Sequence, residues 1–148
     1  MKSMYFEDFD VGRKFSTSTR TILDEDIKNF FELSRIRNRL FTDDEYIKKS
    51  IHKGKIIPGP LTFILATGLF TKLGIMEDTA MAFLGMDKMR LPAPVRPGDT
   101  IRVEVEITET IETKKPDRGV VKESFSVMNQ RDEIVLTYEM AHLIKRRQ

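Results

Sequence analysis

The stretch that decides the fold is residues 54–74, which read Gly-Lys-Ile-Ile-Pro-Gly-Pro-Leu-Thr-Phe-Ile-Leu-Ala-Thr-Gly-Leu-Phe-Thr-Lys-Leu-Gly. Pro60 suits the first position of a helix, because the N–H that proline lacks would have no partner there. Gly74 suits the left-handed residue that ends a helix. Between them, Leu61 to Thr71 carry no charge and are apolar on nearly every face, which is typical of a core helix. We therefore expect a loop and then one buried helix, too short at about 15 residues to cross a bilayer.

The composition indicates one soluble domain over residues 1–148, since 40% of the residues are hydrophobic and 32% are charged. The absence of cysteine excludes a disulfide framework and a thiolate zinc site. The N-terminal residues lack an apolar signal run. We therefore expect a cytoplasmic protein with no metal site and no membrane partner. The 25 basic residues are balanced by 23 acidic ones and are mostly spread along the chain, which argues against nucleic acid as a partner.

Before the core helix, the pattern predicts one strand and two short helices. Residues 13–22 are rich in threonine and end in apolar residues, as a strand does. Asp24 suits the N-cap of an amphipathic helix that ends near Ser34. Thr42 and Glu45 match a capping box, which would open a second helix from residue 43 to about residue 50.

After the core helix, the pattern changes to strands. Residues 81–90 predict one strand, and Pro97-Gly98-Asp99 predicts a turn. Apolar and polar residues alternate strictly over 101–108, which indicates a half-buried antiparallel strand. Turns near 114–119 and 129–133 then separate strands over 120–128 and 134–144. The order predicts an α+β fold, in which a bent antiparallel meander of four strands wraps around the core helix.

The segment from Ser34 to Gly59 resembles the active-site region of the MaoC-like dehydratase family, hot-dog proteins that include (R)-specific enoyl-CoA hydratases. The positions that match the family pattern there are Ser34, Asn38, Leu40, Asp43, Tyr46, Ile56 and Gly59. Further matches follow at Phe83-Leu-Gly85 and at Pro94-Val95 with Gly98-Asp99-Thr100, and residues 5–12 are similar to the family's opening. The resemblance therefore spans almost the whole chain and implies a single hot-dog domain.

The resemblance implies a site for acyl thioesters, carried by CoA or an acyl-carrier protein, with no further cofactor. In the family an Asp and a His hold a water molecule, and the N–H of the glycine that opens the core helix holds the thioester carbonyl. Here Ile36 and Phe41 occupy the Asp and His positions, and neither can take up a proton or hold water. Gly59 and Asn38 are kept, and Pro58 replaces a histidine that is common before the glycine. We therefore expect the site that binds the thioester to remain and the site that holds the water molecule to be lost.

Three residues are candidates for a catalytic role: Gly59 for the carbonyl, Asn38 for orientation, and His52 as the only spare base near the pocket. Each has a plainer alternative, since Gly59 could serve loop geometry, Asn38 could bond the loop backbone, and His52 could be a solvated loop residue. The candidates for substrate binding are Ser34, Ile36, Phe41, Ile57, Pro58, Arg90 and Arg96. The two arginines suit the phosphates of CoA. His142 is expected to be structural.

Three functions remain open from the sequence. The first is a hydratase or dehydratase of acyl thioesters with rearranged catalytic groups. The second is a non-catalytic acyl-CoA-binding protein or partner subunit of a hot-dog hetero-oligomer. The third and weakest is a thioesterase, which would need a carboxylate near the core helix, and no acid lies between Tyr46 and Leu73. We also expect a homodimer or a hetero-oligomer with another hot-dog subunit, because a single hot-dog domain leaves a sheet edge open.

Overall fold

The computed structural model describes residues 2–148, and its antiparallel sheet has the strand order β1-β4-β5-β6-β3, with β2 paired to β4. The strands are β1 (Lys14–Ser16), β2 (Arg20–Thr21), β3 (Ala80–Arg90), β4 (Thr100–Glu112), β5 (Arg118–Met128) and β6 (Ile134–Lys145). The helices are η1 (Phe6–Asp8), α1 (Asp24–Ser34), α2 (Arg39–Thr42), α3 (Asp44–Lys49) and α4 (Gly59–Thr71). The predicted α+β class is confirmed.

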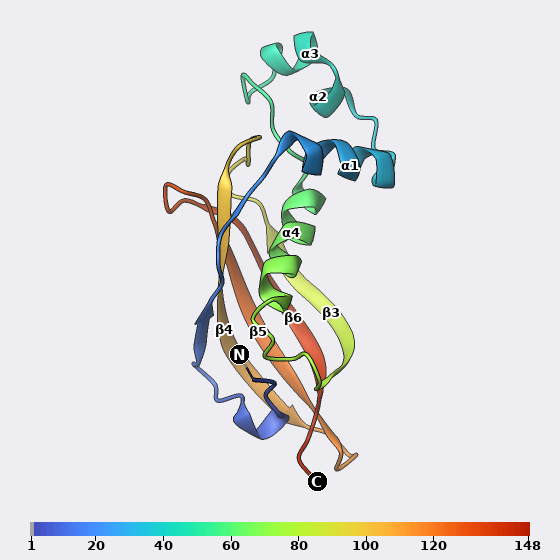
Figure 1. Ribbon diagram of the computed structural model, residues 1–148, viewed down its shortest axis with the longest axis vertical. Helices are drawn as coiled ribbons and strands as arrows, with labels where there is room; N and C mark the ends of the chain where they lie inside the picture. Colours follow the sequence, from blue (N-terminus) through green and yellow to red (C-terminus); the bar gives the residue numbers. More distant parts are fainter. Residues whose placement is uncertain (1) are drawn as a thin grey trace.

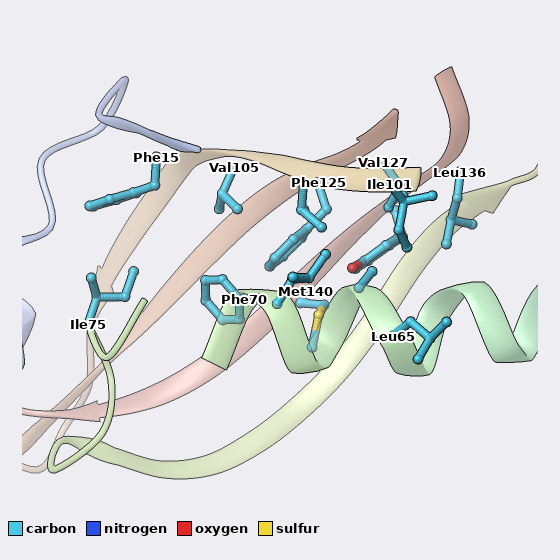
Figure 2. Packing of buried hydrophobic residues seen from close by; sticks show 14 of the residues in the cluster. Phe15, Leu65, Phe70, Ile75, Ile101, Val105, Phe125, Val127, Leu136 and Met140 are labelled. Carbon is cyan, nitrogen blue, oxygen red and sulfur yellow. The ribbon is translucent and has the colours of Figure 1, made fainter. Parts of the chain in front are cut away.

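The core lies between α4 and the face of the sheet that α4 covers (Figure 1). Figure 2 shows Phe70 of α4 pointing toward Phe125 of the sheet, and the centroids of these two rings lie 5.0 Å apart. The alternation predicted for residues 101–108 is confirmed, because Ile101, Val103, Val105 and Ile107 are all buried. The short helices α1, α2 and α3 gather at one end of the sheet, near the N-terminal end of α4 (Figure 1). Helix α1 lies beside the start of α4, and α2 and α3 lie beyond it (Figure 1).

The composition predicted a core helix that is buried on every side, but one side of the helix is exposed. Leu61, Leu65 and Leu69 are buried, whereas Ile64 is 50% exposed and Gly68 is exposed. The helix also begins one residue earlier than predicted, with Pro58 as N-cap and Gly59 as the first helical residue. Gly74 has a φ of 75°, as predicted for a left-handed residue just after the helix. The exposed side of α4 leaves an apolar surface that the sheet of this chain does not cover.

The predicted four-strand meander is wrong in one respect. Strands β4, β5 and β6 follow one another as predicted, but β3 pairs with β6 and lies at the edge of the sheet, far from its neighbour in sequence, β4. Most residues of β3 are exposed. The segment of 91–99 must therefore cross from one edge of the sheet toward the other, and this crossing passes the start of α4.

The first predicted strand is interrupted. Residues 13–22 form two short strands, β1 and β2, that both pair with β4. Between them the buried Thr17 accepts a hydrogen bond from the Val103 N–H through its hydroxyl (2.9 Å) and donates its own N–H to the Val103 carbonyl (3.0 Å). The hydroxyl takes the place of a backbone acceptor, so regular pairing breaks while the segment stays on the sheet.

The predicted helix caps are shifted. The N-cap of α1 is Leu23, and the Asp26 carboxylate accepts its N–H at 2.9 Å, so Asp24 is the first helical residue. The capping box at Thr42 and Glu45 is wrong. Asp43 caps α3 by accepting the Tyr46 N–H at 3.1 Å, and Thr42 instead ends the extra short helix α2. A carboxylate directly before the helix replaces the threonine hydroxyl.

Within residues 2–148, none of the helices combines the length and the apolar character needed to span a membrane.

Candidate functional site

Gly59 is the first residue of α4, and its N–H has no acceptor within the first turn of the helix. The Leu61 and Thr62 N–H groups both donate to the Pro58 carbonyl, at 3.0 and 3.4 Å, and Pro60 has no N–H. The N-terminal end of a helix carries partial positive charge because its first donors lack partners within the helix. A carbonyl oxygen with developing negative charge would therefore be stabilised at Gly59.

A pocket of about 500 Å³ opens beside Gly59, a volume that suits a small ligand. It is lined by Phe41, Ile51, His52, Ile56, Ile57, Gly59, Thr62, Leu91, Pro92, Ala93, Pro94, Val95 and Arg96. The structure thus brings together five of the residues singled out from the sequence: Phe41, His52, Ile57, Gly59 and Arg96. It adds the crossing segment from Leu91 to Val95, whose position depends on β3 lying at the far edge of the sheet.

Ser34 and Asn38 shape the loop before the pocket. The Ser34 hydroxyl accepts the Ile36 N–H at 3.3 Å just after α1 ends. The Asn38 side chain caps α2 by accepting the Leu40 N–H at 2.9 Å. Both side chains are exposed and bond the local backbone, and neither lines the pocket. These contacts support the backbone-bonding alternative for both residues.

Ile36 and Phe41, at the family's Asp and His positions, make apolar contacts. Ile36 is partly buried against the hydrophobic core, and the Phe41 ring lies 6.3 Å from the Phe31 ring. Phe41 also forms one wall of the pocket. The end of the pocket at which the family resemblance implies a bound water molecule is therefore lined by a ring without a hydrogen-bonding group.

His52 and Arg96 lie together at the polar side of the pocket. The Arg96 guanidinium donates to the His52 carbonyl at 2.8 Å and to the Lys55 carbonyl at 3.2 Å, so it fastens the loop that leads into α4. The Arg96 N–H is in turn held by the Asp99 carboxylate at 2.9 Å. His52 is half-buried and is one of the residues that line the pocket.

Four of the predicted binding residues lie outside the pocket lining: Ser34 and Ile36, described above, and also Pro58 and Arg90. Arg90 ends β3 and donates to the Met89 carbonyl at 2.8 Å. Pro58 is buried as the N-cap of α4, and its carbonyl accepts the first backbone bonds of the helix. Pro58 therefore contributes by fixing the start of the helix and the direction of the Gly59 N–H.

Asp43 is a structural acid near this loop. Its hydrogen bond with the Tyr46 N–H, supported by the Arg39 guanidinium, lowers the pKa of its carboxyl. The ionised form is thus favoured, as a helix N-terminus requires. Asp43, which matches the family pattern in sequence, thus serves here as the N-cap of α3.

The sequence analysis missed Glu123, an acid that lies under α4. Its side chain is fully buried, and both of its carboxylate oxygens lie 3.0 Å from Nδ1 of His142. Burial raises the pKa of the Glu123 carboxyl, and the hydrogen bond with His142 offsets part of this rise. The strand pattern could have revealed it, because Glu123 occupies an inward position between the buried Val121 and Phe125.

The described residues contain no cluster of three or more His, Cys, Asp or Glu side chains that could hold a metal ion.

A family model described as a MaoC like domain matches residues 8–128. Among curated proteins, the chain is 34% identical over 101 residues to protein MaoC of Klebsiella aerogenes, which covers 68% of this chain and 30% of that protein. It is 32% identical over 113 residues to an (R)-specific enoyl-CoA hydratase of Rhodospirillum rubrum, covering 75% of this chain and 74% of the hydratase. The chain thus spans less than a third of the Klebsiella protein and about three quarters of the hydratase.

Among solved structures, a monoamine oxidase regulatory protein of Archaeoglobus fulgidus superimposes with a TM-score of 0.93 at 32% identity, covering 100% of this chain and 98% of that one. The structural neighbours are hot-dog proteins, so the predicted hot-dog fold is confirmed.

Proposed function

Because the chain belongs to the MaoC-like dehydratase family, we propose that it binds acyl thioesters of CoA or an acyl-carrier protein and catalyses hydration of the enoyl form or the reverse dehydration. The observation that carries this proposal is the free Gly59 N–H at the start of α4, beside a largely apolar pocket of about 500 Å³. The pocket walls would take the acyl group, and the Gly59 N–H would take the thioester carbonyl.

His52 is the proposed acid–base group. Among the residues that line this pocket, His52 is the one whose side chain has a nitrogen able to accept a proton from water, since the Arg96 guanidinium has no acceptor. The His52 imidazole would take a proton from water as the water oxygen bonds to the β-carbon. The electrons of the double bond then move onto the thioester oxygen, where the Gly59 N–H and the dipole of α4 stabilise them. The imidazolium would return the proton to the α-carbon.

The test is hydration of a panel of trans-2-enoyl-CoA thioesters, followed by loss of the conjugated enoyl absorbance. His52→Ala should lower kcat by about 100-fold or more, which is the usual contribution of a general base. Lys53→Ala is the matched control, because Lys53 is the exposed neighbour of His52 on the same loop. If His52→Ala still hydrates these thioesters, the proposed role of His52 is refuted, but the protein is still a hydratase.

A second candidate is a non-catalytic binding protein or partner subunit, and the apolar contacts of Ile36 and Phe41 favour it. It predicts a folded protein that binds acyl-CoA but hydrates none. Ile36→Asp together with Phe41→His would then install the acid–base pair implied by the family resemblance beside an intact Gly59. A gain of hydration in the double variant, but in neither single variant, would support this candidate. Hydration by the unmodified protein would exclude it.

We also propose that a second hot-dog subunit, either another copy of this chain or a relative, covers β3 and the exposed side of α4. On edge strand β3, Met81, Phe83, Leu84 and Met86 are between 37% and 53% exposed, and on the uncovered side of α4 Ile64 is 50% exposed. A contiguous apolar surface beside an open sheet edge is typical of an interface. Solution scattering should give a dimer or a larger assembly, and Leu84→Glu should shift it toward the monomer. A wild-type monomer would contradict the proposal.

A further inference from the structure

The Thr62 hydroxyl is a buried polar group that forms no hydrogen bond with any of the described residues. Thr62 is 1% exposed and lies in the first turn of α4, three residues after Gly59. A buried hydroxyl without a partner destabilises a fold, because it has given up its bonds to water and gained none in the protein. The folded chain therefore carries a hydrogen-bonding group that its own structure does not use.

The usual acceptor for this hydroxyl is already occupied. A threonine inside a helix commonly donates to the carbonyl four residues earlier, as Thr67 does to the Phe63 carbonyl at 2.9 Å. For Thr62 that carbonyl belongs to Pro58, which accepts the Leu61 and Thr62 N–H groups at 3.0 and 3.4 Å. A carbonyl oxygen has two lone pairs, so backbone donors fill both. The Thr62 hydroxyl is left for a group outside the helix.

Thr62 lines the same pocket as Gly59. Side chains on a helix tilt toward its N-terminal end and cover the turn before their own Cα. Residues three apart also lie on one side of a helix. The Thr62 side chain therefore extends back toward the start of α4, where the Gly59 N–H has no acceptor in the first turn. One backbone donor and one side-chain donor thus lie at the same end of one pocket.

The second buried hydroxyl without a partner in the described part of the chain belongs to Tyr138. Tyr138 does not line the pocket at Gly59. Its ring stacks on Phe125 with the ring centroids 4.7 Å apart, and it meets Phe63 edge-on at 5.1 Å, so it is fixed in the core. Of the two hydroxyls, the one beside the pocket is that of Thr62.

We propose that the Thr62 hydroxyl is the second donor to the thioester carbonyl, whose oxygen is held between the Gly59 N–H and the Thr62 O–H. This inference rests on the proposed binding of acyl thioesters at Gly59. A carbonyl oxygen accepts two donors, and both bonds strengthen as negative charge develops on the oxygen during water addition. Thr62 is then a catalytic residue. In a protein that binds the thioester without hydrating it, the same two bonds fix the carbonyl.

The test is difference infrared spectroscopy of bound hexanoyl-CoA labelled with ¹³C at the thioester carbonyl. This saturated thioester has no double bond to hydrate, so the spectrum reports the hydrogen bonds of an unreacted complex. The carbonyl stretch should lie at lower frequency in the wild-type protein than in Thr62→Val, because each donor weakens the C=O bond. Thr62→Ser keeps the hydroxyl and should restore the wild-type frequency.

Affinity and rate should respond to different extents. One net hydrogen bond to the ground state corresponds to about 2- to 12-fold in hexanoyl-CoA affinity, which Thr62→Val should lose. If the protein hydrates enoyl-CoA, Thr62→Val should lower kcat by about 100-fold or more, as for the loss of one donor to a developing oxyanion. Wild-type protein that binds no hexanoyl-CoA would overturn the proposed function together with this inference. Binding with the same carbonyl frequency in wild type and Thr62→Val would overturn this inference alone.

The melting temperature without ligand separates this role from a structural one. Valine is close to threonine in shape and replaces the unbonded hydroxyl with a methyl group. Thr62→Val should therefore raise Tm by about 2 °C or more. Thr67→Val is the control for Tm and should give no such rise, because the Thr67 hydroxyl already donates to the Phe63 carbonyl. A lower Tm in Thr62→Val would show that its hydroxyl has a partner inside the fold, and this would overturn the proposal.

Discussion

Gly59→Ala separates the proposed role of Gly59 in binding from any role in stability. A Cβ at residue 59 would lie 2.5 Å from Cδ2 of Leu91, and the next nearest atoms lie 3.6 Å away. Leu91 is 52% exposed, so its side chain can turn toward solvent. Losing its remaining contact costs about 1 kcal/mol, roughly half the value of full leucine burial. Alanine regains up to about 1 kcal/mol of backbone entropy in a helix. The free energy of unfolding should therefore change by no more than about 1 kcal/mol.

Binding should respond far more strongly. The added methyl group stands beside the Gly59 N–H and pushes Leu91 within the pocket that both residues line. A thioester carbonyl could no longer approach the donor at hydrogen-bond distance, and a bond to a partly charged oxygen is worth about 1.5–3 kcal/mol. We expect acyl-CoA affinity to fall by about 10-fold or more, as measured by titration calorimetry.

Leu91→Ala and the double variant Gly59→Ala with Leu91→Ala are the controls. Leu91→Ala removes the side chain that the new methyl group would meet, so the double variant relieves the clash but keeps the methyl group beside the N–H. If the double variant recovers wild-type affinity, the loss came from displacing Leu91 and not from blocking the donor. Wild-type affinity in Gly59→Ala itself would refute the proposed position of the carbonyl.

Two further predictions concern stability. Gly119→Ala would place a Cβ 2.4 Å from two ring atoms of the buried Phe6, so urea unfolding should show a loss of about 1–3 kcal/mol, and a loss under about 0.5 kcal/mol would contradict this. The hydrogen bond from Arg147 lowers the pKa of the Asp8 carboxyl below its ordinary value of 3.8. The stability contributed by this ion pair is therefore present above pH 3.8 and lost as pH falls through the lowered pKa. Arg147→Gln should slightly lower the free energy of unfolding at pH 7, as expected for an exposed pair, and leave it unchanged at pH 2; an equal loss at both pH values would argue against the pair.

The elements could be predicted from the sequence where local pattern and tertiary burial agree. Strand β4 was predicted because its apolar residues alternate with polar ones, and only the face turned toward α4 is buried. The position of β3 could not be predicted, because pairing with β6 depends on long-range contacts that leave no local signal. The exposed side of α4 was missed for a related reason. Ile64 is as apolar as the buried Leu65, so composition alone cannot show which side the sheet covers.

The candidate site was predictable in part for the same physical reasons. The resemblance placed Phe41 and Gly59 near one another, and His52 was expected near them because it lies on the loop before α4. All three line one pocket. The wall from Leu91 to Val95 was not predicted, because it depends on where β3 lies. The Glu123–His142 pair was missed because its members lie on neighbouring strands, 19 residues apart, and meet only through the β5–β6 register.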